Sequence, residues 1–273
     1  MPVTVSRTAV LSRRAAGVAL ITAILTLCMP SMSPASDSFS IPFRTGERLT
    51  YQLRWTIVPA GEAVLEVGAV ESVDGKPAYR FMLRARSNAF VDIFYKVRDR
   101  IDAWIDSSMQ YSVGYRKKQR EGSHKRNVHL AFDRKRRQVT YYNYGRAKEP
   151  ITIPDGTLDP LSALYFVRTL SLQPGQEIRR PVTDGKKWVT GVLRVIRKEV
   201  VTVGERRFDT LLLEPDLKHV GGVFEKSPNA RIRVWVTADH RKIPVRVTSR
   251  VVVGSFVAEL VSMSGSDSGA ENP

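Results

Sequence analysis

Two carboxylates in the first half of the chain are the first candidates for acid–base chemistry. Asp102 and Asp106 lie four residues apart with Trp104 between them, which places them on one face of a strand. Four strand residues span about 13 Å, whereas the carboxyl pairs of glycoside hydrolases stand roughly 5–9.5 Å apart. These two groups therefore do not pair as acid and base, and the sequence assigns no catalytic residue.

Metal ligands and nucleophiles are sparse and poorly spaced. His124 and His129 form the one close histidine pair, and their odd separation puts the two rings on opposite faces of a strand. Cys28 is the only cysteine. No Gly-x-Ser-x-Gly elbow and no phosphate-binding glycine loop occurs. We therefore predict no metal and no cofactor, and we favour a non-enzymatic protein while leaving an enzyme open.

Basic residues at the end of two apolar strand faces favour the binding of an anion. Tyr115 shares a face with Lys117, and Leu130 in the next strand shares one with His124 and Arg126. An apolar interior face that turns basic at one end can hold an acyl chain and its anionic head group. The alternative is a strand that leaves the core. The candidate ligand-binding residues of this stretch are Lys117, Arg120, His124 and Arg126.

Two tryptophans are the second binding candidate. Trp104 and Trp235 each lie on the polar-facing side of a predicted strand, among arginines. Rings placed in this way can stack against sugars. The alternative is that a helix, a loop or stacked arginines cover them, as is common for tryptophans of this kind.

The elements that must position these residues are mostly β-strands. Apolar and polar residues alternate with a period of two in several runs, which is typical of strands with one buried face; examples are residues 48–55, 62–67, 79–86 and 231–237. Turn residues separate the runs, among them Asp74-Gly75, Asp184-Gly185 and Gly204. The pattern predicts antiparallel sheets.

One segment, residues 159–170, is predicted to be helical. Asp159 is a suitable N-cap, Pro160 suits the first helical position, and Leu161, Leu164 and Tyr165 form an apolar stripe. The helix is expected to end before Pro174. Asp159 is therefore interpreted as a cap rather than as a carboxylate of a site.

The segments on either side of this helix resemble one another, which indicates an internal repeat. Residues 47–145 and 177–261 match with an offset that drifts from 128 to 131, and the run Arg100-Ile101-x-x-Trp104 corresponds to Arg231-Ile232-x-x-Trp235. Chance similarity between alternating strands is the alternative. We predict a mainly β domain over residues 36–261, with curved antiparallel sheets that form a barrel or half-barrel in two pseudo-repeated halves joined by the helix. A membrane-spanning barrel is the rival architecture.

The N-terminus has the pattern of a secretory signal. Three arginines precede an apolar stretch from Ala15 to Cys28, which is shorter than the roughly 20 residues of a spanning helix, and small residues follow up to Ala35. We predict a cleaved signal peptide over residues 1–35, a periplasmic location and a disordered tail over residues 262–273. Removing residues 1–35 leaves 40 basic and 27 acidic residues, a formal charge of +13. In the envelope this charge favours anionic lipid, lipopolysaccharide or acidic glycan over nucleic acid.

Several runs resemble one known family. They include Phe43-Arg44-Thr45-Gly46-Glu47-Arg48-Leu49, Phe94-Tyr95-Lys96-Val97-Arg98-Asp99, the segment Asp159–Tyr165, and Val234-Trp235-Val236-Thr237. Together they are similar to the DUF3108 proteins of bacteria over roughly Pro42 to Ser262. The resemblance implies an exported β-rich domain and carries no catalytic residue, because that family has no assigned function.

The hypothesis that unites these observations is a periplasmic, non-enzymatic binding or carrier protein for an anionic, partly apolar envelope component, such as a lipid or glycolipid. Peripheral membrane contact is compatible with it. A scaffold that contacts other envelope proteins through its sheet edges is the alternative, and an enzyme that modifies glycans or lipids is the third.

Overall fold

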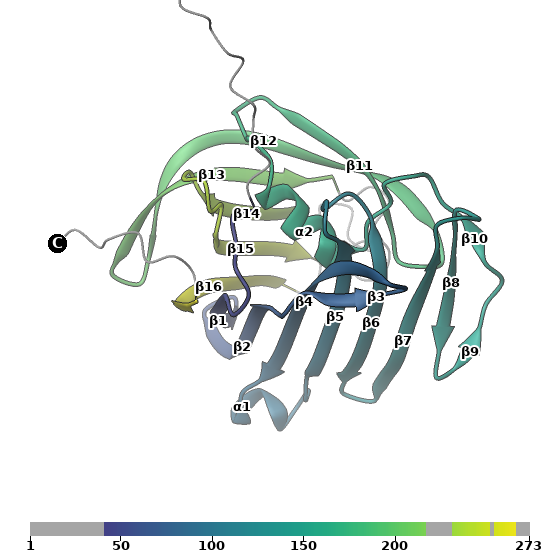
Figure 1. Cartoon of the computed structure of the whole chain (residues 1–273). Helices are drawn as coiled ribbons and strands as arrows, with labels where there is room; N and C mark the ends of the chain where they lie inside the picture. The colour runs from purple at the N-terminus through teal and green to yellow at the C-terminus, as the bar shows by residue number, and fades with distance from the viewer. Residues whose placement is uncertain (1–40, 217–230, 252–253, 266–273) are drawn as a thin grey trace, which may run out of the picture. The chain divides into compact units, whose positions relative to one another are not determined.

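The chain folds into one antiparallel sheet that curls around a helix (Figure 1). The computed structural model describes residues 41–216, 231–251 and 254–265. The predicted signal peptide, residues 1–35, and residues 266–273 of the predicted tail lie outside the described residues. No helix among these residues has the length and apolar character needed to cross a bilayer.

The first half of the sheet contains ten strands and one short helix. They are β1 Arg48–Trp55, β2 Val58–Val67, β3 Glu71–Val73, β4 Lys76–Ser87, α1 Ala89–Asp92, β5 Arg98–Asp106, β6 Ser112–Glu121, β7 His124–Asp133, β8 Gln138–Asn143, β9 Arg146–Ala147 and β10 Ile151–Thr152. The second half begins with the longer helix. It comprises α2 Pro160–Arg168, β11 Glu177–Thr183, β12 Trp188–Val203, β13 Arg206–Pro215, β14 Arg231–Thr237, β15 Pro244–Val251 and β16 Gly254–Ser264.

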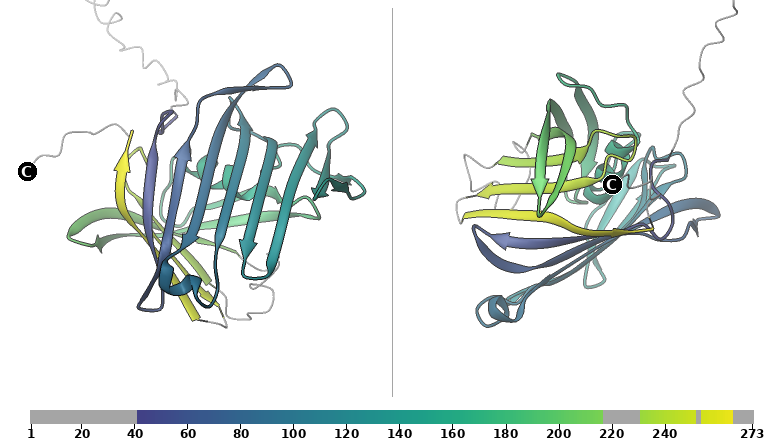
Figure 2. Two further views of the ribbon diagram at one scale, coloured as in Figure 1. Left: turned by 90° about the horizontal axis from the view of Figure 1, so that it is seen from below. Right: turned by 90° about the vertical axis from the view of Figure 1, so that its left-hand side faces the viewer.

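Both halves are meanders that meet where the first strand pairs with the last. The main strand order is β10-β8-β7-β6-β5-β4-β2-β1-β16-β15-β14-β13-β12-β11, with β3 paired to β4 and β9 to β8. The path does not close between β10 and β11, so the sheet is an open half-barrel. Figure 2 shows the strands of the first half side by side in one layer, with the second half turned across them. A parallel bridge between Leu158 and Val182 spans part of the gap.

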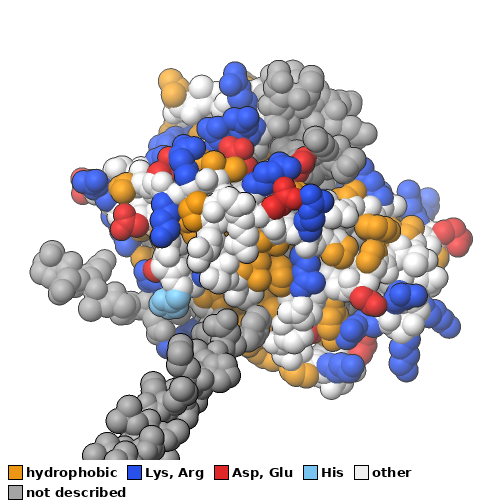
Figure 3. Space-filling model, turned by 90° about the horizontal axis from the view of Figure 1, so that it is seen from above, with side chains coloured by type: hydrophobic (Ala, Val, Ile, Leu, Met, Phe, Trp, Pro, Cys, Tyr) orange, Lys and Arg blue, Asp and Glu red, His pale blue; other side chains and the backbone are white. Residues whose placement is uncertain are grey.

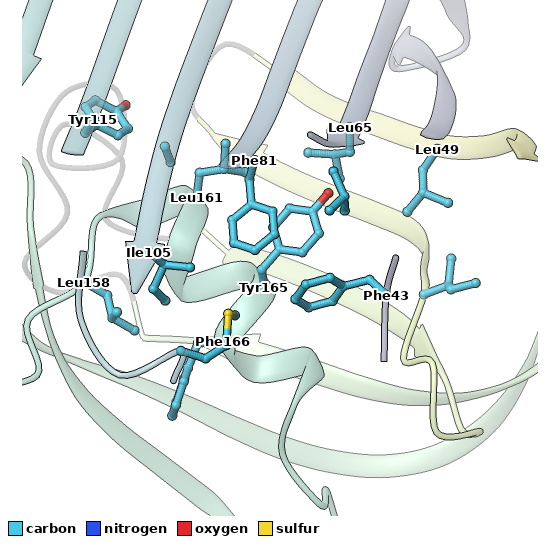
Figure 4. Packing of buried hydrophobic residues seen from close by; sticks show 14 of the residues in the cluster. Phe43, Leu49, Leu65, Phe81, Ile105, Tyr115, Leu158, Leu161, Tyr165 and Phe166 are labelled. Atoms are coloured by element: carbon cyan, nitrogen blue, oxygen red, sulfur yellow. The ribbon is translucent and has the colours of Figure 1, made fainter. Parts of the chain in front are cut away.

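The core fills the concave side of the sheet. The Phe81 ring of β4 stacks on the Tyr165 ring of α2 with centroids 3.7 Å apart, and the Phe43 ring meets both edge-on at 5.3 Å (Figure 4). Alternation predicts this arrangement, because residues such as Leu49 and Tyr51 in β1 face inward and are buried.

The helix α2 begins where the sequence predicts. The Asp159 carboxylate accepts hydrogen bonds from the backbone N–H groups of Leu161 and Ser162 at 2.9 and 3.0 Å, and Pro160 occupies the first turn. The mainly β fold with its single joining helix is thus confirmed.

One boundary and one element differ from expectation. Strand β16 continues to Ser264, three residues into the predicted tail, because Ser262 and Met263 pair with Thr50 and Leu49 of β1 and Met263 packs against the core. The short helix α1 has no counterpart in the predicted elements, since four residues are too few to show helical periodicity.

Candidate ligand-binding cleft

The structure brings two of the predicted binding residues together on the inner face of the sheet. Lys117 on β6 and Arg126 on β7 lie close enough for their charges to interact: burial, and then the charge of Arg126, lower the pKa of Lys117. His124 is exposed at the start of β7, on the same face as Arg126. Arg120 alternates with Lys117 and so lies on the opposite, outer face of β6.

Two carboxylates accompany the inner cations. Asp99 accepts a hydrogen bond from the backbone N–H of Arg120 at 2.9 Å. Burial, helped by the Glu121 side chain, raises the pKa of Asp99 to about 6, although the Arg120 backbone N–H and Lys117 act to lower it. The inner cations are therefore partly balanced by acidic groups, which weakens their attraction for an anionic ligand.

The raised pKa of Asp99 predicts a pH-dependent stability. Between the ordinary pKa of 3.8 and about 6 the folded chain binds more protons at Asp99 than the unfolded chain, so the free energy of unfolding falls as pH rises through that window. In Asp99→Asn this slope is expected to diminish, and the variant should exceed the wild type in stability above pH 7. Urea titrations from pH 4.5 to 8 measure both curves.

Asp155→Asn is the matched control for this titration, because Asp155 is exposed. Its stability curve should run parallel to that of the wild type. Parallel curves for the wild type and Asp99→Asn would contradict the assignment.

The two predicted tryptophans are covered by charged side chains. Trp104 and Trp235 are each 9% exposed. Arg80 and Arg116 lie over the Trp104 ring at 5.3 and 5.5 Å from its centroid, and Arg246 lies over the Trp235 ring at 6.0 Å. Stacking on a sugar would require these guanidinium groups to move, so the ligand-binding role of both rings stays a prediction.

Both tryptophans make the same hydrogen bond in their own half of the sheet. Trp104 Nε1 donates to Glu71 at 2.7 Å, and Trp235 Nε1 donates to Glu199 at 2.6 Å. Each glutamate lies two strands away, on β3 and on β12. An internal duplication accounts for this recurrence, and the duplication itself stays an inference.

The apolar face predicted to hold an acyl chain is filled by the protein itself. Tyr115, Val128 and Leu130 are buried in the core. The turn between β11 and β12 reaches this face: a Cβ on Gly185 would stand 2.2 Å from Leu130 Cδ2 and 3.2 Å from Tyr141 Cδ2. The sequence pattern does not reveal this contact, because the turn lies about 55 residues further along the chain than Leu130.

A cleft of about 880 Å³ lies elsewhere, between α2 and strands β11–β14. The helix contributes one wall through Ala163, Leu164 and Val167. The opposite wall is largely aliphatic and comes from the second half of the sheet, with Ile178, Val182, Val189, Leu193, Leu213 and Val234. In Figure 3 a strip of hydrophobic side chains is visible between Lys and Arg side chains on the face seen from above.

Arg180 supplies a cation beside these apolar walls. Its guanidinium lies over the Phe166 ring at 4.4 Å and donates a hydrogen bond to the Gln110 side-chain oxygen at 2.5 Å. Burial lowers the pKa of Arg180, which shows that its charge is incompletely solvated. No carboxylate lies within ion-pair distance of it among the residues that the structure describes, although the charge of Asp106 raises the pKa of Arg180 against the larger effect of burial.

The arginine on the neighbouring strand is already neutralised. Arg194 donates to Glu177 at 3.0 Å and pairs with Asp216 at 3.6 Å. An anionic group that enters the cleft is therefore better placed to meet Arg180 than Arg194.

The sequence offers only a faint signal for this cleft. Gly191 interrupts the alternation of β12 inside the wall, and a Cβ there would stand 3.0 Å from Val182 Cγ2. No group of three or more His, Cys, Asp or Glu side chains within the described part of the chain is arranged to hold a metal ion. The cleft thus presents aliphatic walls together with the side chains of Arg179, Arg180 and Arg194.

Comparison with known proteins identifies a family and a fold. The family model described as "Protein of unknown function (DUF3108)" matches residues 50–261. No curated protein matches the chain. Among solved structures, a β-barrel-like protein of the domain of unknown function DUF1849 from Brucella abortus is similar at 12% identity with a TM-score of 0.52, over 81% of this chain and 98% of that one.

A second solved structure, from Bacteroides fragilis, is described as a "putative exported protein with YmcC-like fold". It has 11% identity and a TM-score of 0.37, over 83% of this chain and 99% of that one. At 12% identity the similarity to the first structure concerns the fold alone, and it supports a barrel-like arrangement.

Proposed function

We propose that this chain, which belongs to the DUF3108 family, is an exported, non-enzymatic binding or carrier protein for an anionic, partly apolar component of the bacterial envelope, such as a lipid or glycolipid. One observation carries the proposal. The cleft between α2 and β11–β14 combines aliphatic walls with a cation, Arg180, that forms no direct ion pair among the described residues and feels only the more distant charge of Asp106.

The size and lining of the cleft suit the apolar part of such a ligand. Its volume of about 880 Å³ falls within the roughly 300–1,000 Å³ of typical small-molecule sites. Burial of an acyl chain against Leu164, Val167 and Leu193 removes apolar surface of both partners from water, which contributes about 25 cal/mol per Å².

The charge of the protein suits the anionic part. Arg180 is partly buried beside the Phe166 ring, so a carboxylate or phosphate that reaches it would form a charge-assisted hydrogen bond in poorly solvated surroundings. The formal charge of +13 after residues 1–35 favours anionic partners in general. Export through an N-terminal signal and a periplasmic location rest on the pattern of residues 1–35.

A pair of fluorescent probes tests this site: a long-chain fatty acid and its uncharged methyl ester. The wild type is expected to bind the acid more tightly than the ester. Ala163→Trp should weaken both probes, because the indole fills the cleft from α2. Arg180→Gln should weaken the acid by about tenfold and leave the ester unchanged, since it removes one hydrogen bond to a charged group.

The matched control is Arg206→Gln, because Arg206 also lies over an aromatic ring, that of Phe208, at 5.2 Å. It should bind both probes as the wild type does. Unsaturable binding by the wild type, or equal affinity in Ala163→Trp, would overturn the proposal. So would the absence of any lipid or glycolipid in a mass-spectrometric extract of the protein purified from the envelope.

The open sheet edge favours the scaffold function as a second candidate. Residues Glu177–Arg180 of β11 pair with β12 on one side and have no strand on the other among the described residues. A free edge is a template for a strand from another protein. Crosslinking from this edge in the envelope separates the two functions, because a scaffold gives one dominant protein adduct and a carrier does not.

A further inference from the structure

We propose that one end of the sheet is a membrane-docking surface, which places apolar side chains into the head-group region of an anionic bilayer. We call this surface the apolar rim. It is formed by the β1–β2 turn, the segment that contains α1 and the beginning of β16, and its residues are Trp55, Ile57, Val58, Phe90, Ile93, Phe94 and Phe256. This proposal is independent of the cleft.

The rim exposes large apolar side chains to an unusual degree. Ile57 is 84% exposed, and Ile93 and Phe94 are each 75% exposed. Single exposed apolar residues are common in soluble proteins, but contiguous groups of them mark binding sites. The rim therefore needs a partner that accepts apolar groups.

Hydrogen bonds hold the three segments of the rim side by side. Asn88 donates from its backbone N–H to the Ala60 carbonyl at 2.9 Å and from Nδ2 to the Pro59 carbonyl at 2.7 Å, which ties α1 to β2. Trp55 pairs with Phe256 across β1 and β16. Figure 2 shows α1 and the β1–β2 turn at the same end of the sheet in both views.

The polar groups of the α1 segment are satisfied within the protein. The Asp92 carboxylate accepts hydrogen bonds from Arg98, at 2.6 Å from Nη2, and from the Ser87 hydroxyl. The Phe90 and Phe94 rings lie edge to face with centroids 5.7 Å apart, and both are largely exposed. The segment is thus fixed by its polar side chains and presents its apolar ones outward.

A basic groove adjoins the rim on the outer face of the sheet. It has a volume of about 460 Å³ and is lined by seven basic residues and by the acidic residues Glu62 and Asp99. The basic residues are Arg48, Arg84, Arg86, Arg98, Arg100, Lys118 and Arg120. The first five form ion pairs with carboxylates, whereas Lys118 and Arg120 form none among the described residues. Arg86 and Arg98 pair across β4 and β5 at the strand ends next to α1.

This combination fits an anionic bilayer better than a protein groove. Aromatic and aliphatic side chains on protruding turns suit the interface between head groups and acyl chains, where tryptophan and tyrosine are enriched. The basic residues of the groove that form no ion pair, Lys118 and Arg120, gain about 1 kcal/mol each near an anionic surface. The positive charge of the groove and the exposed apolar side chains of the rim therefore both fit an anionic bilayer.

Vesicle flotation tests the rim directly. The wild type is purified in the form that the cells produce. Every variant is purified with the same N-terminus as the wild type. Vesicles of phosphatidylcholine alone are compared with vesicles that contain phosphatidylglycerol. The wild type should float with the anionic vesicles, less so at high salt, and the double variant Ile93→Ser, Phe94→Ser should bind at least about tenfold more weakly. Brominated lipids should quench the wild type more than Trp55→Phe.

Val200→Ser is the matched control, because Val200 is 51% exposed on β12 away from the rim; it should float like the wild type. Ala163→Trp should also float, so a failure of the cleft proposal is distinguishable from a failure of this one. Unchanged flotation of the double variant at unchanged melting temperature would overturn the rim as a docking surface. A dimer that dissociates in the double variant would overturn it too, since a second copy would then be the occupant.

Discussion

Replacing Arg168 by alanine is expected to lower the free energy of unfolding by about 3–5 kcal/mol, the cost of leaving one charge of a buried pair without its partner. Arg168 at the end of α2 and Glu47 before β1 are each 1% exposed. Two parallel hydrogen bonds join them, with Nη1 and Nη2 donating to the two carboxylate oxygens at 2.5 and 2.9 Å. Arg168 Nε also donates to the Arg241 carbonyl at 3.1 Å.

The large effect comes from the burial of the pair rather than from the attraction between its two charges. Arg168→Ala leaves the Glu47 carboxylate in the core, beside the Phe43 and Tyr165 rings that now flank the guanidinium. Urea unfolding followed by circular dichroism measures the loss. The double variant Arg168→Met, Glu47→Leu should recover most of it, because apolar residues can replace a buried ion pair at little cost.

Arg194→Ala is the matched control, since its pairs with Glu177 and Asp216 lie at a surface where Arg194 is 49% exposed. It should cost no more than about 1 kcal/mol. If Arg168→Ala lost no more than Arg194→Ala, the pair would not stabilise the attachment of α2 to the first half.

Removal of the Asp159 carboxylate is expected to have the second largest effect, about 2–4 kcal/mol in Asp159→Ala from a lost helix cap and unpaired hydroxyl groups. Asp159 is fully buried. Beyond the two backbone N–H groups that it caps, its Oδ2 accepts hydrogen bonds from the hydroxyls of Ser112 and Ser162, both at 2.6 Å. The cap therefore also fastens α2 to β6.

Asp159→Asn separates capping from charge. Burial raises the pKa of Asp159, so loss of the charge costs little, and Oδ1 of the amide still accepts hydrogen bonds from the two backbone N–H groups. The amide nitrogen cannot accept from the Ser112 and Ser162 hydroxyls, so Asp159→Asn should be less stable than the wild type but more stable than Asp159→Ala. Asn88→Ala at the cap of the exposed helix α1 should cost only about 0.5–1 kcal/mol. Thermal and urea unfolding measure all three variants, and equal losses in Asp159→Ala and Asn88→Ala would contradict the role assigned to the buried carboxylate.

Local patterns were enough to predict several of the elements. Alternation in residues 48–55 and 231–237 corresponds to β1 and β14, and Asp74-Gly75 forms the turn between β3 and β4 with both residues at positive φ. The start of α2 was visible because a cap and a proline act within one helical turn. These features depend on neighbours in the chain, which a sequence displays directly.

The packing around α2 and the candidate cleft depends on contacts that no local pattern contains. Glu47 and Arg168 stand 121 residues apart, and the arginines that cover Trp104 come from β4 and β6. The sequence pattern predicts an open inner face near Lys117, but in the structure the β11–β12 turn covers Leu130 on this face. The cleft arises because α2 and the β11–β12 hairpin leave space between them, and the sheet stays open because β10 and β11 do not pair. Periodicity states which face of each strand is buried, but only the packed chain decides what each face is buried against.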